Sequence, residues 1–226
     1  AIPGTKCVFF NGAEGDVGST HVNPSGGDMN DTEISFDNEM KSPGMARFVG
    51  RAIAGTVLQV YDKVNYRDVN TLRFAQKVSD LPSNMPKPED MPLAHKYNEL
   101  HKAGKDSEIP FEGMELTTVV AEAARMVRLE HGPKSFPMNF IGVAVGNVAL
   151  LGIPGEPFND IGKAIKKSSP FAMTMLTCLS NGSRGYFPFS DAYKTGGYES
   201  ATSPFGPTVA DDLIAGQLKL LDSLYK

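Results

Sequence analysis

The order of hydrophobic and polar residues predicts a chain that mixes strands with helices. Apolar runs at residues 140–145 and 147–153 predict a hairpin of two buried strands, because the Gly146-Asn147 pair between them suits a tight turn. Further strands are expected at residues 6–10, 69–78 and 172–179. Apolar residues at helical spacing predict helices at residues 43–61, 93–103, 115–131, 158–168 and 208–224. The pattern therefore predicts an α/β fold in which helices flank a mixed sheet.

Two segments of the chain lack this periodicity. Residues 19–42 are rich in Asn, Asp, Ser and Gly, and a loop of this length inside a compact domain is often functional. Residues 79–92 hold four prolines and are expected to form a linker. Neither segment has the character of a domain boundary. We therefore expect one α/β unit whose weakest joint is the proline-rich segment.

Charge and composition exclude several classes of partner. The chain has 22 basic and 26 acidic residues and a net charge of −4, which argues against a nucleic-acid-binding surface. No stretch of the sequence approaches the ~18–20 apolar residues that a membrane-spanning helix needs. Cys7 and Cys178 both lie in apolar runs, so we expect buried free thiols rather than a disulfide.

Glu156 is the first candidate for chemistry. It follows a predicted buried strand and the Pro154-Gly155 pair, and α/β proteins bind ligands just beyond the carboxyl ends of their strands. A carboxylate here could bind a metal ion or act as a general base. It could equally be an acidic residue in the first turn of the following helix, where the helix dipole favours it. The local sequence does not separate these readings.

Asp16, Tyr186 and Tyr198 are further candidates, each with a plain structural alternative. Asp16 lies in a glycine-rich turn, where an Asp usually bonds to neighbouring backbone amides. Each tyrosine follows a glycine, which indicates close backbone approach, although most tyrosines serve packing. His21 is the one histidine of four in the polar loop, and no two histidines have zinc-ligand spacing. The chain alone cannot supply a histidine-rich zinc site.

Four short segments together resemble the neutral/alkaline ceramidases and their bacterial relatives. These segments agree with that family in order and spacing over nearly the whole chain, and they are residues 9–17 (FFNGAEGDV), 152–158 (GIPGEPF), 179–186 (LSNGSRGY) and 197–207 (GYESATSPFGP).

The resemblance implies a zinc-dependent hydrolase of an N-acyl amide bond, in which zinc-bound water attacks the carbonyl. It implies that Glu156 and Tyr186 are zinc ligands and that Tyr198 polarises the scissile carbonyl. It also implies that Asp16 and Ser19 line the active site. Ceramide, the family's substrate, would be cleaved to sphingosine and a fatty acid, so a small N-acyl or lipid-like substrate is expected.

The family's two remaining zinc ligands are histidines from a segment upstream of the Gly15-Asp16 motif. The resemblance thus implies that residues 1–226 are the C-terminal part of a ceramidase-like catalytic domain. Its partner would be an N-terminal fragment of the same polypeptide, which carries the two histidines. The resemblance further implies a secreted or periplasmic protein.

One departure from the family pattern leaves the substrate open. The serine of the Gly-Asp-Val-Ser-Pro-Asn motif is displaced by one position here, to Ser19, and Asn23 and Pro24 follow in reversed order. Two alternatives therefore stand beside the ceramidase-like amidase. One is a zinc hydrolase that acts on a different acylated substrate, and the other is a non-catalytic relative that binds lipid or carbohydrate.

Overall fold

The computed structural model describes residues 3–18, 43–65 and 68–226, with side chains omitted for 43–46. The chain divides into two compact units. The larger combines Ala1–Val17 with Val69–Lys226, and the smaller is Gly18–Asp68. The smaller unit contains helix α1 (Pro43–Tyr61), as the sequence predicts. The divisions between the units fall at residues 17–18 and 68–69, and not at the proline-rich segment.

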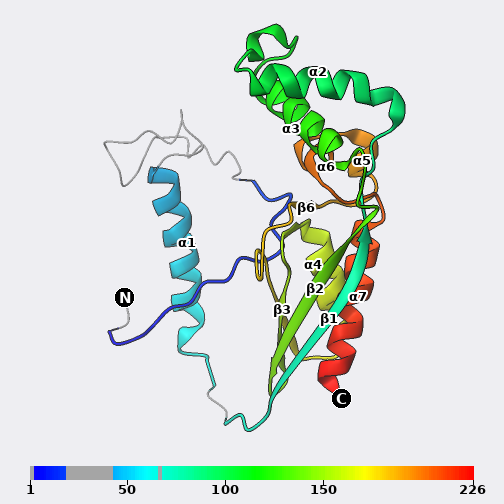
Figure 1. The fold of residues 1–226 in the computed structure, drawn as a ribbon. Coiled ribbons are helices and arrows are strands. Elements are labelled where there is room, and N and C mark those ends of the chain that lie inside the picture. The colour runs from blue at the N-terminus through cyan, green and yellow to red at the C-terminus, as the bar shows by residue number, and fades with distance from the viewer. Residues whose placement is uncertain (1–2, 19–42, 66–67) are drawn as a thin grey trace. The chain divides into compact units, whose positions relative to one another are not determined.

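The larger unit is built on a four-stranded mixed sheet with the order β1-β2-β3-β5 (Figure 1). Its strands are β1 (Leu72–Pro82), β2 (Ser135–Val145), β3 (Val148–Gly152) and β5 (Met173–Thr177). The pairs β1–β2 and β2–β3 are antiparallel, whereas β3–β5 is parallel. The predicted hairpin is confirmed, and its turn residue Gly146 has a φ of 58°, which glycine adopts without strain. The α/β class is confirmed.

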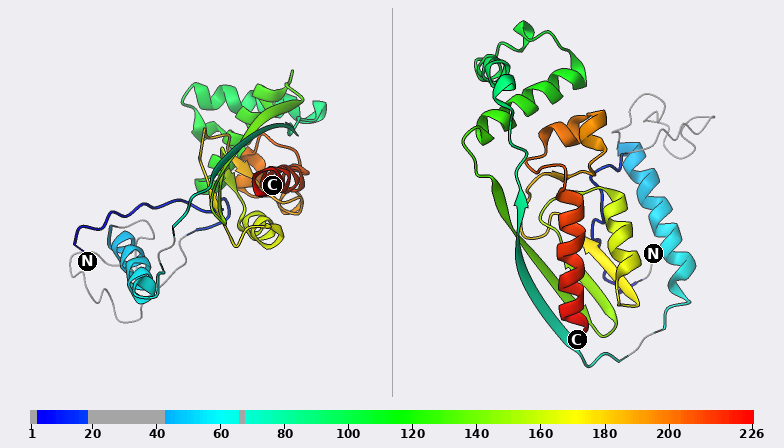
Figure 2. Two further views of the ribbon diagram at one scale, coloured as in Figure 1. Left: turned by 90° about the horizontal axis from the view of Figure 1, so that it is seen from below. Right: turned by 90° about the vertical axis from the view of Figure 1, so that its right-hand side faces the viewer.

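Helices α4 (Asn159–Ser168) and α7 (Val209–Tyr225) cover one face of this sheet (Figure 2). Alternate residues of the strands face these helices, as the two-residue period of a strand requires. The fully buried side chains of this core come from the strands, from both helices and from the segments that follow β3 and β5. They include Phe140, Leu151, Ile153, Ile161, Phe187, Phe205, Leu213 and Leu220.

A second, smaller core joins α2 (Met91–Lys102) to α3 (Gly113–Leu129). Its buried members are Met91, Ala94, Tyr97, Ile109, Val120 and Ala123. The short helices α5 (Ala192–Thr195) and α6 (Tyr198–Thr202) lie at the same end of the sheet as this helix pair (Figure 1). Helix α3 packs against α6, so the helix pair supports the segment that carries Tyr198.

The segment at residues 6–10 corrects one prediction. It forms no strand, and Val8 and Phe9 are 72% and 71% exposed. A strand needs a neighbour for its backbone groups, and no described strand pairs with this segment. Cys7 is consequently exposed, contrary to expectation, whereas Cys178 is buried as predicted. Both cysteines are free, which confirms the expectation of no disulfide.

The proline-rich segment is more ordered than the sequence predicts. Strand β1 continues to Pro82, a 3₁₀ turn covers Pro88–Asp90, and α2 begins at Met91. The outward face of β1 exposes Leu72, Phe74 and Val78, while Arg73 on the other face donates to the carbonyl of Gly146. None of the described helices has the length and apolar character that crossing a membrane requires.

The contact between α7 and the sheet generates a stability prediction. A Cβ on Gly216 would overlap the ring of fully buried Phe140, whereas a Cβ on Gly55 of α1 meets no atom within 4 Å. Gly216→Ala should therefore lower the free energy of unfolding by about 1–3 kcal/mol, despite the better helix propensity of Ala. Gly55→Ala should not lower it. Urea unfolding followed by circular dichroism checks both, and equal stability of the two variants would contradict the packing.

Candidate functional site

Two successive parallel pairings bring Glu156 and Tyr186 together. The parallel strands β3 and β5 end in register, with Gly152 opposite Thr177. Beyond those ends the chain forms the short strands β4 (Glu156–Pro157) and β6 (Tyr186–Phe187), which pair in parallel with Glu156 opposite Tyr186. The Glu156 amide donates to the carbonyl of Gly185 at 2.9 Å. The two predicted zinc ligands thus lie side by side at the carboxyl ends of neighbouring strands.

The turn between β5 and β6 is fixed by backbone contacts with the segment before Glu156. Its residues Leu179 and Asn181 have φ values of 54° and 63°, and residues other than glycine rarely adopt this backbone conformation. The amide of Ser180 donates to the carbonyl of Ile153 at 3.0 Å, and that of Leu179 donates to the carbonyl of Gly155 at 3.2 Å. These bonds hold the strained turn and so direct the chain into β6.

Tyr198 joins the pair from a separate element. It is the first residue of α6, and its ring meets the Tyr186 ring edge to face, with centroids 6.1 Å apart at 76°. Such an arrangement is favourable for aromatic pairs. Glycine precedes Tyr198 with a φ of 125°, a backbone conformation that residues with a Cβ avoid. Glu156, Tyr186 and Tyr198 therefore come from three elements and form one cluster.

Two buried polar side chains hold this cluster in place. Arg125 of α3 is 4% exposed, and it donates to the carbonyls of Ala201 in α6 and Asn84, both at 2.7 Å. Burial lowers the pKa of Arg125, while Glu122 at 3.3 Å opposes that shift. The fully buried Ser203 hydroxyl donates to the Tyr186 carbonyl at 2.8 Å. Both contacts set the positions of the tyrosines without touching their hydroxyls.

Acidic groups outnumber basic ones around the cluster, so its surroundings are negatively charged. Burial raises the pKa of Glu156, and the carboxylates of Glu14 and Glu199 raise it further, whereas a hydrogen bond from Tyr186 lowers it. Burial also raises the pKa of Tyr186, followed by the charge of Glu156. Among the described residues, no cationic side chain contributes to either shift. A cation bound beside Glu156 would offset the repulsion.

The turn that contains Asp16 is fastened to β4. Its neighbour Gly15 donates to the carbonyl of Pro157 at 2.9 Å, and a Cβ on Gly15 would overlap the Glu156 carbonyl oxygen. Asp16 Oδ1 accepts from the amide of Asn159 at 2.6 Å, at the start of α4. Asp16 therefore caps a distant helix, which is a different contact from the neighbouring amides that turn chemistry predicts.

The described histidines of α2 are paired with acidic residues away from Glu156 and Tyr186. Ser19 and His21 lie outside the described residues. In α2, His95 pairs with Glu130 at 2.9 Å, and His101 pairs with Asp106 at 2.8 Å. No group of three or more His, Cys, Asp or Glu side chains able to hold a metal occurs in the described part of the chain. Glu156 and Tyr186 thus supply two oxygen donors, half of what a zinc site needs.

Sequence reasoning missed four residues that shape the cluster. Glu14 and Glu199 stand within the quoted motifs, two residues before Asp16 and directly after Tyr198, and these positions were a usable signal. Arg125 and Ser203 carried no comparable signal. Arg125 sits inside an apolar helical pattern, and only the position of α6 shows why a charged group is buried there.

The comparisons with known proteins bear on the fold. No family model and no curated protein matches the sequence. Among solved structures, the chain is similar to neutral ceramidase from Pseudomonas aeruginosa, with a TM-score of 0.51 and 14% identity over 88% of this chain. Another similar structure is a ceramidase complexed with C2, with a TM-score of 0.36 and 19% identity, covering 41% of this chain and 15% of that one.

The first of these similarities shows that the chain shares its fold with part of a neutral ceramidase. The chain spans only 35% of the length of that structure. It therefore corresponds to a portion of that protein, which agrees with the ceramidase-like fold that the sequence motifs predict.

The close approach at Gly15 gives a test of how the Asp16 turn is held. Gly15→Ala should detach the turn from β4 and lower the free energy of unfolding by about 1–3 kcal/mol, because the opposing atom belongs to the backbone and cannot rotate away. Gly12→Ala is the matched control, since a Cβ there meets no atom within 4 Å. Amide hydrogen exchange at Asn159 reports the detachment, and unchanged protection in Gly15→Ala would refute it.

The raised pKa of Glu156 gives a prediction of pH dependence. A folded-state pKa above the unfolded value means that folding favours the protonated acid, so stability is lost as the pH rises through the folded pKa. Without added metal, Glu156→Gln should be more stable than the parent at pH 7, and the difference should shrink near pH 4. Urea titrations in EDTA measure this, with the exposed Glu99→Gln as control. A variant less stable than the parent at pH 7 would contradict the assignment.

Proposed function

We propose that this chain provides part of the active site of a zinc-dependent hydrolase that cleaves N-acyl amide bonds in a ceramidase-like manner. Glu156 and Tyr186 are two of the zinc ligands, and two histidines outside the described residues complete the set. Tyr198 donates to the substrate carbonyl. The observation that carries the proposal is the parallel register of β4 and β6, which sets Glu156 beside Tyr186, whose ring meets that of Tyr198.

The residues present fit half of a zinc site. A carboxylate and a phenol are both oxygen donors that zinc accepts, and they share one register position. Burial raises the pKa of each, and a bound cation would favour the ionised form of both groups. When bound, zinc would act as a Lewis acid toward the carbonyl and lower the pKa of water.

The residues of this chain have distinct duties in the proposed site. A bound cation would keep Glu156 ionised beside its acidic neighbours, and Glu156 and Tyr186 would be the residues of this chain that hold it. The Tyr198 hydroxyl donates a hydrogen bond to the carbonyl oxygen as negative charge develops there. Its ring is held by Tyr186 and its helix by Arg125, so the donor is positioned before reaction. Asp16 caps α4, and we retain Ser19 as a residue that lines the substrate pocket.

Zinc content and kinetics of the full-length protein test these roles separately. We expect about one zinc per active site, and Glu156→Gln and Tyr186→Phe should each lower zinc affinity by at least about tenfold. Tyr198→Phe should keep the zinc and lower kcat on an N-acyl substrate about 10²–10³-fold, as removal of one oxyanion donor does. Tyr225→Phe, whose ring lies against Phe171 instead, is the control.

The outcome also separates the alternatives. Stoichiometric zinc retained by Glu156→Gln would remove Glu156 from the ligand set. A protein without zinc would favour a non-catalytic binding protein of the same fold. Zinc with turnover of O-acyl but not N-acyl compounds would assign the site to a different acylated substrate.

A further inference from the structure

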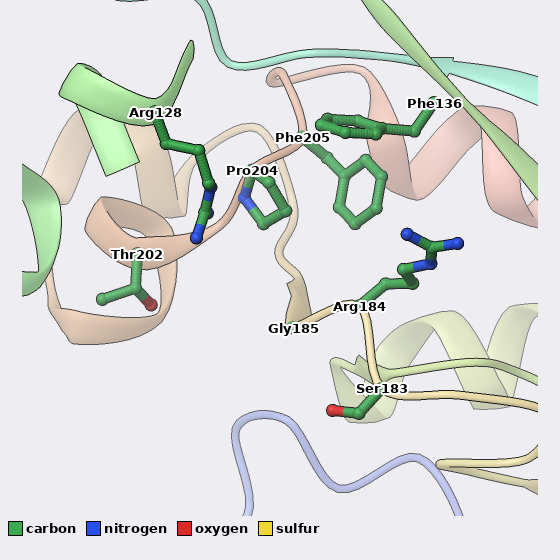
Figure 3. Close-up of a pocket in the computed structure, with 8 residues that line it drawn as sticks. All are labelled: Arg128, Phe136, Ser183, Arg184, Gly185, Thr202, Pro204 and Phe205. Carbon is green, nitrogen blue, oxygen red and sulfur yellow. The ribbon is translucent and has the colours of Figure 1, made fainter. Parts of the chain in front are cut away.

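A pocket of about 440 Å³ lies beside the candidate site, and the proposed hydrolase does not use it (Figure 3). We call it the arginine pocket. The lining residues that matter here are Arg128, Phe136, Arg184, Thr202, Pro204 and Phe205. Its volume lies within the range of about 300–1,000 Å³ that is typical of small-molecule sites.

Two arginines line the pocket. Arg128 comes from α3 and Arg184 from the turn before β6, and both are exposed. Neither guanidinium makes a hydrogen bond or an ion pair with any described residue. Arg125, one helical turn before Arg128, is the contrast, because its guanidinium is buried and bonds to Ala201 and Asn84. The pocket therefore offers two guanidinium groups that no described residue engages.

The wall between the arginines is aromatic and rigid. Figure 3 shows Arg128 and Arg184 on two sides of the Pro204 and Phe205 rings. Phe205 is 1% exposed, stacks on Phe187 at 4.8 Å and meets Phe136 edge to face at 5.7 Å. The hydroxyl of Thr202 already donates to the Tyr198 carbonyl at 2.7 Å. Recognition in the pocket thus combines two cationic groups with an apolar surface.

We propose that the arginine pocket binds an organic anion, a carboxylate or phosphate monoester attached to an apolar body. Guanidinium groups match both oxyanions with paired hydrogen bonds. The apolar body packs on the half-buried side chains of Pro204 and Phe136, so a bare inorganic anion leaves that surface uncovered. The proposal is independent of zinc and of amide hydrolysis, because it uses none of Glu156, Tyr186 or Tyr198.

Calorimetric titration of the purified chain with hexyl phosphate, hexanoate, inorganic phosphate and 1-hexanol tests the proposal. We expect saturable one-to-one binding of hexyl phosphate, hexanoate or both, at least tenfold tighter than inorganic phosphate or 1-hexanol. Which of the two amphiphiles binds tighter identifies the head group. Arg128→Gln, Arg184→Gln or both should weaken that binding at least tenfold, since the arginine that holds the head group supplies hydrogen bonds to a charged group. Added salt should weaken binding as well.

Lys219→Gln is the matched control, because Lys219 is an exposed cation in α7 that does not line the pocket. It should leave binding unchanged, and circular dichroism confirms that each variant is folded. Binding that is equally tight in the parent, Arg128→Gln and Arg184→Gln would overturn the proposal. Equal affinity for inorganic phosphate and hexyl phosphate, or for 1-hexanol and hexanoate, would overturn it as well.

Discussion

The candidate site depends on the parallel pairing of β3 with β5. Because these strands end in register, the two segments that leave them run side by side, and they pair again as β4 and β6. Backbone hydrogen bonds, rather than the side chains of Glu156 and Tyr186, bring those two residues together. The side chains are therefore free for chemistry while the backbone fixes their spacing.

Glycines make this close approach possible. A Cβ on Gly155 would lie 2.5 Å from both the Gly185 carbonyl oxygen and the Phe187 ring, and one on Gly15 would overlap the Glu156 carbonyl. Three segments distant in sequence thus pack backbone against backbone around Glu156. The glycines of the ceramidase-like motifs have a structural role here, because larger residues would separate the segments.

The same arrangement carries an electrostatic cost. Glu156 is partly buried near Glu14 and Glu199, and the described chain supplies no cation beside it. A fold that holds a carboxylate in such surroundings gives up some stability, a pattern typical of functional sites. Arg128 and Arg184 line a pocket that does not include Glu156, and they are not among the groups that shift its pKa. The larger unit therefore presents one acidic cluster and one basic pocket, with distinct chemistry.

The sequence by itself determined most of the element types. Periodicity is local, so the helices, the hairpin at Gly146 and the buried strand at residues 173–177 could be predicted. It also marked Glu156, Tyr186 and Tyr198 as candidates. Tertiary structure alone decided that Glu156 pairs with Tyr186, that Asp16 caps α4, that residues 6–10 are exposed, and that Arg125 is buried while Arg128 is not. Those outcomes depend on partners far away in the chain, which no local pattern encodes.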